Sequence, residues 1–423
     1  MRMVKTILFL SSILVLLSGC GNRNNSNFSK NDKNDILLSN EIDEDDSDDD
    51  SDNFYFIDLE HLVKNMIADE FIINNIAKEI NFIPLETTDE SLLETSEFRI
   101  AKIKERFYIS CRDRFLFSGI MEFDTNGHYT KHLLLKNPGN GPNELPNIIS
   151  WSYNHNTQLI AASNARQIVL HSFENNTTNK YTLNTASWSE CLLNDETMVS
   201  KPAFSDSKRL GHPDIPYLYF RNKECEIIDS VFYPEKRDIA YANDDQTLLS
   251  SHQLFPHPSG DALFQDVFSD TIQRIRSMHD IKPYMVLNRG SLAPSPKDAN
   301  NQSRINQTIQ IENILDTKQY IFIRFWQAKE GRTANTAVWN KETRSFVANI
   351  KVEYSDNSLL LSGHKQGWFV TKYISPNGKE MIIPILRYIE GKLYSVIEAE
   401  QAMDFLPGVV HDDNPILMII DIE

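Results

Sequence analysis

The sequence predicts an all-β fold, a six-bladed β-propeller, preceded by a signal peptide and a disordered acidic tether. Two observations carry this prediction. From residue 82 onward, short apolar and aromatic runs alternate with turn signals at a spacing of roughly 8–12 residues, which is typical of sandwiches, barrels and propellers. The folded part, residues 54–423, is long for one sandwich, whereas radial repetition of four-stranded sheets accommodates it. Six blades would take roughly 60 residues each, somewhat above better-known propeller repeats.

The first twenty residues have the pattern of a bacterial export signal. A short basic region is followed by an apolar run at residues 7–17, which is too short to span a membrane. The run ends in Leu-Ser-Gly-Cys20, which resembles the lipobox of bacterial lipoproteins, where the thiol receives diacylglycerol and becomes the new N-terminus. We therefore predict a signal peptide at residues 1–19 and lipidation of Cys20. An ordinary signal peptide that contains a Cys is the alternative. Gly21, where Asp would favour the inner membrane, favours the outer membrane.

Residues 20–53 form the predicted tether, a lipidated Cys followed by an acidic, disordered linker. Nine of the twelve positions from 41 to 52 are acidic, and like charges repel and extend a chain. The linker is either a spacer with a role in surface display or a solvated segment that nothing recognises. A calcium loop starting at Asp48 fails, because Asn53 stands where that loop needs Gly.

Composition restricts the classes of partner. The net charge is −17, which argues against nucleic acid, whose phosphates attract basic faces. Membrane contact is therefore expected through the lipid anchor alone, and the body is expected to be a monomer. Three cysteines remain besides Cys20, namely Cys111, Cys191 and Cys225, and they lack CxxC spacing. We expect buried free thiols, with a single disulfide as the alternative.

The elements follow in chain order. One helix is expected at residues 59–67, because Leu59, Leu62, Val63, Met66 and Ile67 share a face. A turn at residues 124–127 (Asp-Thr-Asn-Gly) separates two strands. The expected strands are at residues 82–85, 107–111, 115–117, 119–123, 129–135, 158–161, 167–170, 321–326, 368–370 and 416–420.

Five stretches, in order from residue 82 to 417, resemble the six-bladed β-propeller lipoproteins of the Bacteroidetes, a mostly uncharacterised family. They are an opening IPLE-T-ES-L strand, a G-x-GP-x-E loop, a D-T-I element with Gln273 in place of Tyr, residues 282–287 at the place of the family's P-x-Y strand, and a closing D-N-P-x-L strand. The resemblance implies this fold and export, and it implies no activity. Its structural motif residues are Pro84, Leu85, Glu86, Gly139, Gly141, Pro142, Glu144, Asp270, Thr271, Ile272, Asn414 and Pro415.

The chemistry of these motifs predicts structural roles first. Gly139 and Gly141 permit positive φ and Pro142 fixes its own φ, so the segment is expected to be a tight turn rather than a phosphate loop. Asn414-Pro415 forces an extended entry into the last strand. We expect that strand to close the ring by pairing with residues 54–57, and we expect trimming of the chain after Asn414 to destabilise the whole body.

No catalytic constellation is present in the sequence. G-x-S-x-G and H-E-x-x-H are absent, and His252 and His257 flank a Pro-containing loop without ligand spacing. The tripeptides starting at Asp229 and Asp270 resemble the acceptor for O-glycosylation in Bacteroidetes, at Ser230 and Thr271, although a structural role is favoured for the second. The tryptophans could stack on sugars but are expected mainly in the core, namely Trp151, Trp188, Trp326, Trp339 and Trp368.

The predicted function is that of an envelope-anchored binding or scaffold module for a peptide, glycan or protein. The alternative is a metal-dependent enzyme of the lactonase or lyase kind that uses the propeller channel. A third reading is a structural envelope protein that acts through its acidic tether. No cofactor is predicted, a divalent metal in the channel is left open, and enzymatic activity is the less favoured reading.

Overall fold

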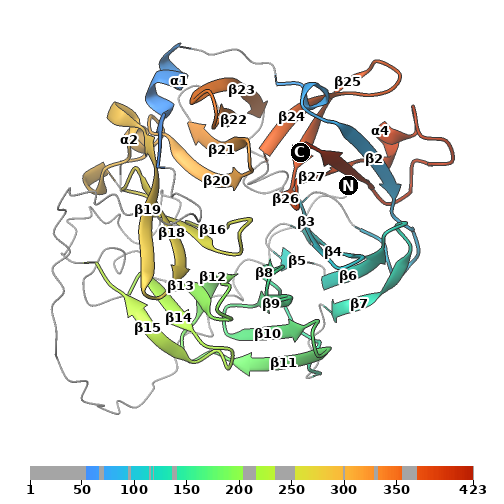
Figure 1. The fold of residues 1–423 in the computed structure, drawn as a ribbon, viewed down its shortest axis with the longest axis horizontal. Coiled ribbons are helices and arrows are strands. Elements are labelled where there is room, and N and C mark those ends of the chain that lie inside the picture. Colours follow the sequence, from blue (N-terminus) through green and yellow to red (C-terminus); the bar gives the residue numbers. More distant parts are fainter. Residues whose placement is uncertain are drawn as a thin grey trace, which may run out of the picture. The chain divides into compact units, whose positions relative to one another are not determined.

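The computed structural model is a ring of β-sheets, the predicted six-bladed propeller (Figure 1). Six sheets of four or five strands are the blades, numbered here along the chain. The predicted signal peptide, Cys20 and the predicted acidic tether lie outside the described residues. The structure describes residues 54–65, 71–93, 97–113, 116–117, 119–135, 141–202, 216–233, 253–298, 301–327, 332–354 and 369–422.

Blades 1 to 3 are consecutive antiparallel sheets, each with its first strand innermost in the ring. Blade 1 contains β3 (Glu97–Ile103), β4 (Arg106–Asp113), β5 (Leu116–Phe117), β6 (Gly119–Asp124) and β7 (Tyr129–Leu135). Blade 2 contains β8 (Ser150–Asn154), β9 (Leu159–Ser163), β10 (Gln167–Ser172) and β11 (Thr177–Thr182). Blade 3 contains β12 (Ser187–Leu192), β13 (Met198–Pro202), β14 (Leu218–Arg221) and β15 (Ile227–Val231).

Blades 4 to 6 carry additions. Blade 4 contains β16 (Gln253–Pro256), β17 (Ala262–Gln265), β18 (Thr271–Ser277) and β19 (Asp280–Asn288), with β1 (Tyr55–Asp58) as a fifth strand. Blade 5 contains β20 (Gln310–Asp316), β21 (Tyr320–Gln327), β22 (Arg332–Asn340) and β23 (Ser345–Tyr354). Blade 6 contains β26 (Arg387–Ile389), β27 (Lys392–Ile397), β28 (Ile416–Asp421) and β2 (Glu79–Pro84).

Short helices and one small sheet complete the described body. The strands β24 (Phe369–Ile374) and β25 (Glu380–Ile385) pair with each other and pack between blades 5 and 6. The predicted N-terminal helix is present as α1 (Leu59–Asn65). The other helical turns are η1 (Ile73–Asn75), η3 (Gly290–Leu292), η4 (Pro296–Asp298), α2 (Gln302–Ile305) and α4 (Ala399–Ala402).

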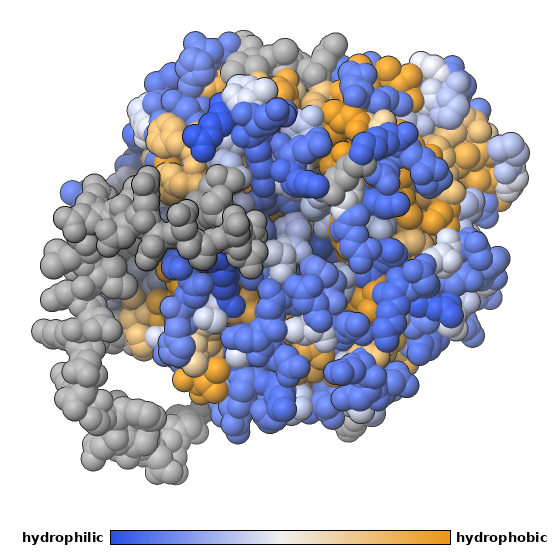
Figure 2. Space-filling model, in the orientation of Figure 1, coloured by the Kyte–Doolittle hydropathy of each residue, from blue (hydrophilic) through white to orange (hydrophobic). Residues whose placement is uncertain are grey.

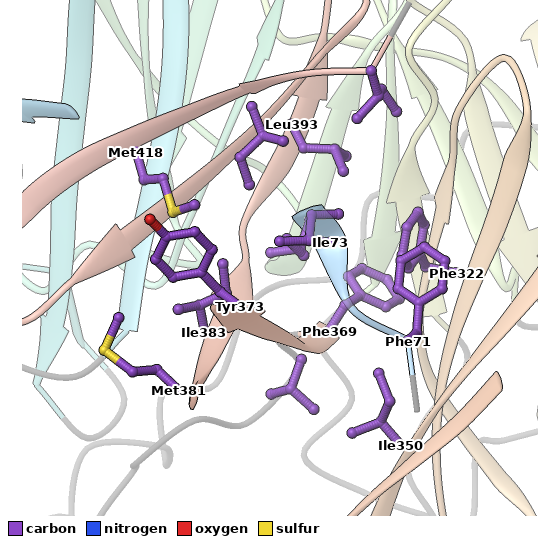
Figure 3. Close-up of a cluster of buried hydrophobic side chains, with 14 of the residues drawn as sticks. Phe71, Ile73, Phe322, Ile350, Phe369, Tyr373, Met381, Ile383, Leu393 and Met418 are labelled. Carbon is purple, nitrogen blue, oxygen red and sulfur yellow. The ribbon is translucent and has the colours of Figure 1, made fainter. Parts of the chain in front are cut away.

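A hydrophobic cluster fills each of the six interfaces between neighbouring blades. The strands carry apolar side chains on both of their faces, because each sheet packs against a neighbouring sheet on either side. Figure 3 shows the cluster between blades 5 and 6, where Phe71 and Ile73 of the N-terminal segment pack with Phe322 and Phe369. Each fully buried side chain of this size contributes roughly 1.5–3 kcal/mol. Each cluster has members from both blades of its interface. From the blade 1–2 interface round to the blade 6–1 interface, they include Tyr108 and Ile160, Leu170 and Leu192, Phe220 and Phe264, Leu263 and Ile323, Phe322 and Leu393, and Phe107 and Tyr394.

The ring closes through β2, not through residues 54–57 as predicted. β2 pairs antiparallel with β28 over six residues, from Glu79 opposite Asp421 to Pro84 opposite Ile416. The segment at Tyr55 instead pairs in parallel with β19. The prediction was wrong because both segments are short and apolar, and pattern alone does not choose between them. Pro84 fits the end of an outer strand, where one missing N–H donor costs little.

Asn414 fastens this closure. Its Nδ2 donates to the carbonyl oxygens of Glu86 (2.7 Å) and Ser91 (2.9 Å), and its Oδ1 accepts the N–H of Leu93 (2.8 Å). Its own N–H donates to Thr87 Oγ1 (2.7 Å), and the side chain is buried. The opening and closing motifs of the sequence therefore meet at one side chain.

Glu86 and Gly127 extend the same junction into blade 1. Glu86 Oε2 accepts the N–H of Tyr129 (2.8 Å), and the Glu86 N–H donates to the carbonyl oxygen of Gly127 (2.8 Å). Gly127 has φ +87°, and a Cβ there would lie 2.1 Å from the carbonyl oxygen of Pro84. The predicted turn at residues 124–127 thus needs glycine at its last position for two independent reasons.

We predict that Asn414→Ala lowers the free energy of unfolding by about 3 kcal/mol, because the Ser91 carbonyl and the Leu93 N–H lose their partner and the Glu86 carbonyl keeps only the Ser91 hydroxyl. Asn75→Ala is the matched control: Asn75 is exposed, and a change of less than about 0.5 kcal/mol is expected there. Urea unfolding of the two variants measures the difference. Removal of the chain after Asn414 deletes β28 and should abolish the cooperative transition, and an unchanged transition would contradict closure through β2.

Candidate functional site: the centre of the ring

The predicted G-x-GP-x-E loop is a turn, as far as it is described. Glu144 Oε2 accepts the N–H of Gly141 (2.9 Å), and the Glu144 N–H donates back to the Gly141 carbonyl oxygen (3.2 Å). Lys180 Nζ donates to the Glu144 carbonyl oxygen (2.9 Å). Pro142 lies between Gly141 and Glu144 in the chain. Gly139 lies outside the described residues. The bonds between Gly141 and Glu144 are internal to the turn, the bond from Lys180 ties the turn to β11, and all of them support a structural role.

The D-T-I element is also structural. Asp270 Oδ1 accepts Nε of Arg289 (2.7 Å), whose guanidinium also donates to the carbonyl oxygens of Val267 (3.1 Å) and Ser269 (2.8 Å). Arg289 is fully buried and Ile272 lies in the core. The pair fixes the chain after β19 to the start of β18. Thr271 is half-buried, as is Ser230 on β15, the outer strand of blade 3, and glycosylation of either stays a prediction.

Polar side chains link the turns that follow the innermost strands. Asn154 Nδ2 donates to the carbonyl oxygen of Gly260 (2.9 Å), and Asn194 Nδ2 donates to Asp261 Oδ1 (3.3 Å). A Cβ on Gly260 would lie 2.1 Å from Asn194 Oδ1, so the approach requires glycine. Blades 2, 3 and 4 are therefore joined at this end of the ring, which we call the turn end. Three further contacts, Tyr153 to Lys102, Lys318 to Tyr388 and Lys102 to Glu390, join blades 1, 2, 5 and 6 there.

A buried carboxylate connects blades 4 and 5 at the turn end. His257 Nε2 lies 3.2 Å from Asp316 Oδ2, the Tyr284 hydroxyl also donates to Oδ2, and Lys341 ion-pairs with Oδ1. Burial raises the pKa of Asp316, but the hydrogen bond from His257 and the charge of Lys341 outweigh it, so that pKa lies below its ordinary value. Burial and the Asp316 charge raise the pKa of Tyr284. The ammonium of Lys341 lies over the ring of Tyr55 at 5.3 Å, which ties β1 to the same group.

Ser259 contacts His257, and His257 contacts Asp316, in the order of a nucleophile, a base and an orienting acid. Ser259 Oγ lies 2.7 Å from His257 Nδ1. However, Ser259 Oγ also donates to Asp261 Oδ2 (2.8 Å) and accepts from Arg274 Nη2 (3.2 Å). The hydroxyl is thus held within a tight turn whose other groups already bond one another. We interpret the cluster as a junction between blades.

The centre of the ring gathers charged side chains from opposite blades. In ring order the innermost strands are β3, β8, β12, β16, β20 and β26, so β26 faces β12 across the centre (Figure 1). Arg387 begins β26, and its charge acts on Tyr153 of β8, on His155 and on Cys191 of β12. Arg387 thus belongs to an innermost strand, which borders the centre of the ring, where a propeller has its channel.

Arg99 and Glu190 approach the same region. Arg99 Nη1 donates to the carbonyl oxygen of Trp151 (2.7 Å), and its charge acts on both Glu190 and Cys191. Glu190 is fully buried, and Ser163 Oγ donates to its Oε2 (2.6 Å). Burial raises the pKa of Glu190 despite that bond and the charges of Arg221 and Arg99. On β13 burial lowers the pKa of Lys201 to about 8.

The remaining candidate residues are placed as follows. Cys111, Cys191 and Cys225 are buried free thiols, as predicted, and burial raises the pKa of Cys191 and of Cys225 to about 12. These thiols are poor nucleophiles. Trp151 and Trp339 lie in the core as expected, Trp326 is half-buried and Trp188 is exposed on β12. His252 and Trp368 lie outside the described residues.

Three other features of the described residues bear on the choice of candidate site. No helix among them is long and apolar enough to cross a membrane. In the same part of the chain, no three His, Cys, Asp or Glu side chains gather as they would to hold a metal ion. A small apolar cavity lies between blades 1 and 2, lined by residues such as Ile120, Leu134 and Val169, and it is remote from the charged groups. The ring centre therefore stays the candidate site.

Sequence patterns did not reveal the groups of this site. Arg99, Glu190 and Arg387 are separated by about ninety residues or more, and no local pattern links them. Only the ring brings the three together. The one available signal was a charged residue inside a strand that otherwise packs in the core, which is costly unless it is partnered or used.

A model of a family described as a domain of unknown function, DUF4934, matches residues 54–421. The chain belongs to this family. The match begins just before β1 and ends in β28, so the DUF4934 domain is the whole closed ring, with both of its N-terminal strands. No curated protein matches the chain.

Solved structures that are similar to this DUF4934 chain have low sequence identity. A DUF4221 family member from Bacteroides vulgatus is 13% identical, with a TM-score of 0.45, over 82% of this chain and 96% of its own. Virginiamycin B lyase from Staphylococcus aureus is 10% identical, with a TM-score of 0.39, over 81% and 99%. A Bacteroides thetaiotaomicron protein of unknown function is 8% identical, with a TM-score of 0.38, over 84% and 75%.

We predict that Asp316→Asn destabilises the ring by about 3 kcal/mol at pH 7, because Lys341 loses its buried partner. The folded pKa of Asp316 is lowered, so its contribution is present above the unfolded value of about 3.9 and is lost as the pH falls through the folded pKa. The stabilities of wild type and variant should therefore converge in acid. Urea unfolding from pH 7 down to pH 3 measures this, with the exposed Asp412→Asn as control. A constant difference across that range would contradict the assignment.

Proposed function

We propose that this chain is an envelope-anchored lipoprotein whose propeller binds a peptide, glycan or protein ligand at the centre of the ring. The observation that carries the proposal is the convergence of polar side chains from four blades. Arg99, Tyr153, Glu190 and Arg387 come from β3, β8, β12 and β26. The charge of Arg387 acts on Tyr153, that of Arg99 acts on Glu190, and both act on Cys191 of β12. Such a centre offers a ligand several convergent polar contacts on a rigid scaffold.

The surface supports the same proposal. The face seen in Figure 2 is hydrophilic over most of its described area, and hydrophobic colour gathers over the sector of β2, β25 and α4. With a net charge of −17, the chain repels anionic surfaces. Attachment to a membrane is therefore assigned to a lipid on Cys20, and the acidic segment that follows it serves as the spacer. Placement at the outer membrane is part of this proposal.

We predict that Cys20→Ser abolishes lipid attachment, because the thiol is the acceptor. Labelled palmitate fed to a bacterial host that processes lipoproteins should enter the wild-type chain and the Cys225→Ser control, since Cys225 is buried in the ring. Membrane fractionation should move the Cys20→Ser chain to the soluble fraction. Label in Cys20→Ser, or its absence from wild type, would refute the anchor.

We predict that a defined panel of peptides and glycans contains a ligand that raises the melting temperature of residues 20–423 carrying Cys20→Ser. Binding at the ring centre should weaken at least fivefold in Arg99→Gln, because the charge of this arginine acts on Glu190 and Cys191 of the innermost strand of blade 3. It should be unchanged in Arg304→Gln, since Arg304 lies on α2 beside Asp298. Isothermal titration measures both. Ligands that bind equally to both variants would place the site elsewhere, and a panel without stabilisation would count against the binding role.

The metal-dependent lactonase or lyase stays a prediction, which elemental analysis and a calcium-induced shift in melting temperature test.

A further inference from the structure

The tryptophan of blade 3, Trp188, is placed unlike the tryptophans of the core. It is the second residue of β12, the innermost strand of its blade, and it is 46% exposed. β12 runs toward the turn end, so Trp188 lies at the opposite end of the ring, which we call the start end because the innermost strands begin there. Among the side chains that the structure describes on the six innermost strands, only those of Trp188 and Arg99 are exposed.

A β-bulge presents this side chain. Two steps along β12, from Ser187 to Ser189, match a single step along β13 that ends at Lys201, so Trp188 is an extra residue in the strand. The buried hydroxyl of Ser187 donates to the Lys201 carbonyl oxygen (2.9 Å), and the Ser187 N–H donates to the carbonyl oxygen of Ala165 in blade 2 (2.9 Å). A bulge redirects a side chain, and bulges are common beside functional sites. The backbone at Trp188 is therefore fixed from two blades while the indole remains exposed.

The chain on either side of Trp188 offers neutral polar groups. Asn184 is exposed and Ser189 is half-buried, whereas the carboxyl of Glu190 is buried. The other exposed large apolar side chains of the described residues lie off the innermost strands, for example Phe56 on the outer strand β1. A protein partner is usually met by a cluster of apolar and aromatic side chains. A lone indole beside hydroxyl and amide groups instead favours a sugar, whose ring has a C–H face for the indole and hydroxyls for the polar groups.

We propose that Trp188 is a stacking platform for a pyranose ring of a glycan, at the start end of the ring centre. The negative face of the indole attracts the C–H groups on one side of the sugar ring. Each sugar hydroxyl can both donate and accept, which matches neutral amide and hydroxyl groups such as those of Asn184 and Ser189. This inference rests on the proposed binding role and names the class of ligand, a carbohydrate.

Isothermal titration of residues 20–423 carrying Cys20→Ser tests the platform, with neutral hexasaccharides of glucose, mannose, galactose and N-acetylglucosamine as the probes. We expect saturable binding of at least one probe. Its dissociation constant should rise at least tenfold in Trp188→Ala and less than threefold in Trp188→Tyr, which keeps an aromatic face. Phe56→Ala, the matched control, removes an exposed aromatic ring from an outer strand and should leave the constant within twofold. No saturable binding of any probe, or equal affinity in Trp188→Ala and wild type, would overturn the proposal.

Thermal unfolding separates binding from folding. Trp188→Ala should melt within about 2 °C of wild type, because the indole is exposed and Ser187 holds the bulge through its own hydroxyl. A larger drop would show that Trp188 packs in the fold and would overturn the platform. If a peptide binds weakly to Arg99→Gln but equally to Trp188→Ala and wild type, the binding role stands and the glycan assignment fails. If neither peptides nor glycans bind, both fail.

Discussion

The pairing of β2 with β28 is the constraint on which the rest of this structure depends. Six sheets that pack face to face bury their apolar side chains only when each has two neighbours, so an open ring would expose two interfaces. Closure joins residues 79–84 to residues 416–421, more than three hundred positions apart. Because loop-closure entropy opposes so distant a contact, hydrogen bonds must fix its register. Asn414 supplies them, since it satisfies three backbone groups of the opening segment at once.

Two sets of polar groups divide the interior between them. At the turn end, amides and the Asp316 cluster satisfy one another, and each links a blade to the next. Buried polar groups of this kind stabilise a fold because every donor and acceptor has a partner. At the centre, the charges of Arg99 and Arg387 both act on Cys191, and Glu190 is buried with Ser163 as a hydrogen-bond donor. The turn end therefore serves as scaffold, and the charged centre is the candidate site.

Much of the fold could be predicted from the sequence, whereas the site could not. Period-two strands, turn residues and length indicate a propeller, and Asn414-Pro415 marks the last strand because its chemistry is local. The partner of that strand was mispredicted, since the segments at Tyr55 and Phe82 have the same apolar texture and differ only in long-range pairing. Arg99, Glu190 and Arg387 are invisible as a motif, because their proximity is a property of the ring and not of spacing.

The N-terminal region contributes its two strands to different blades, β1 to blade 4 and β2 to blade 6. β1 adds to the outer edge of blade 4 in parallel, and Lys341 lies over its Tyr55 ring while bonding Asp316. η1 then fixes Phe71 and Ile73 between blades 5 and 6 before β2 completes blade 6. The N-terminal chain therefore passes over the outside of three blades and leaves the innermost strands uncovered. Closure at the rim fixes which strands line the centre, and there Arg99 and Glu190 also bond to the neighbouring blade, so the same side chains serve both the ring and the candidate site.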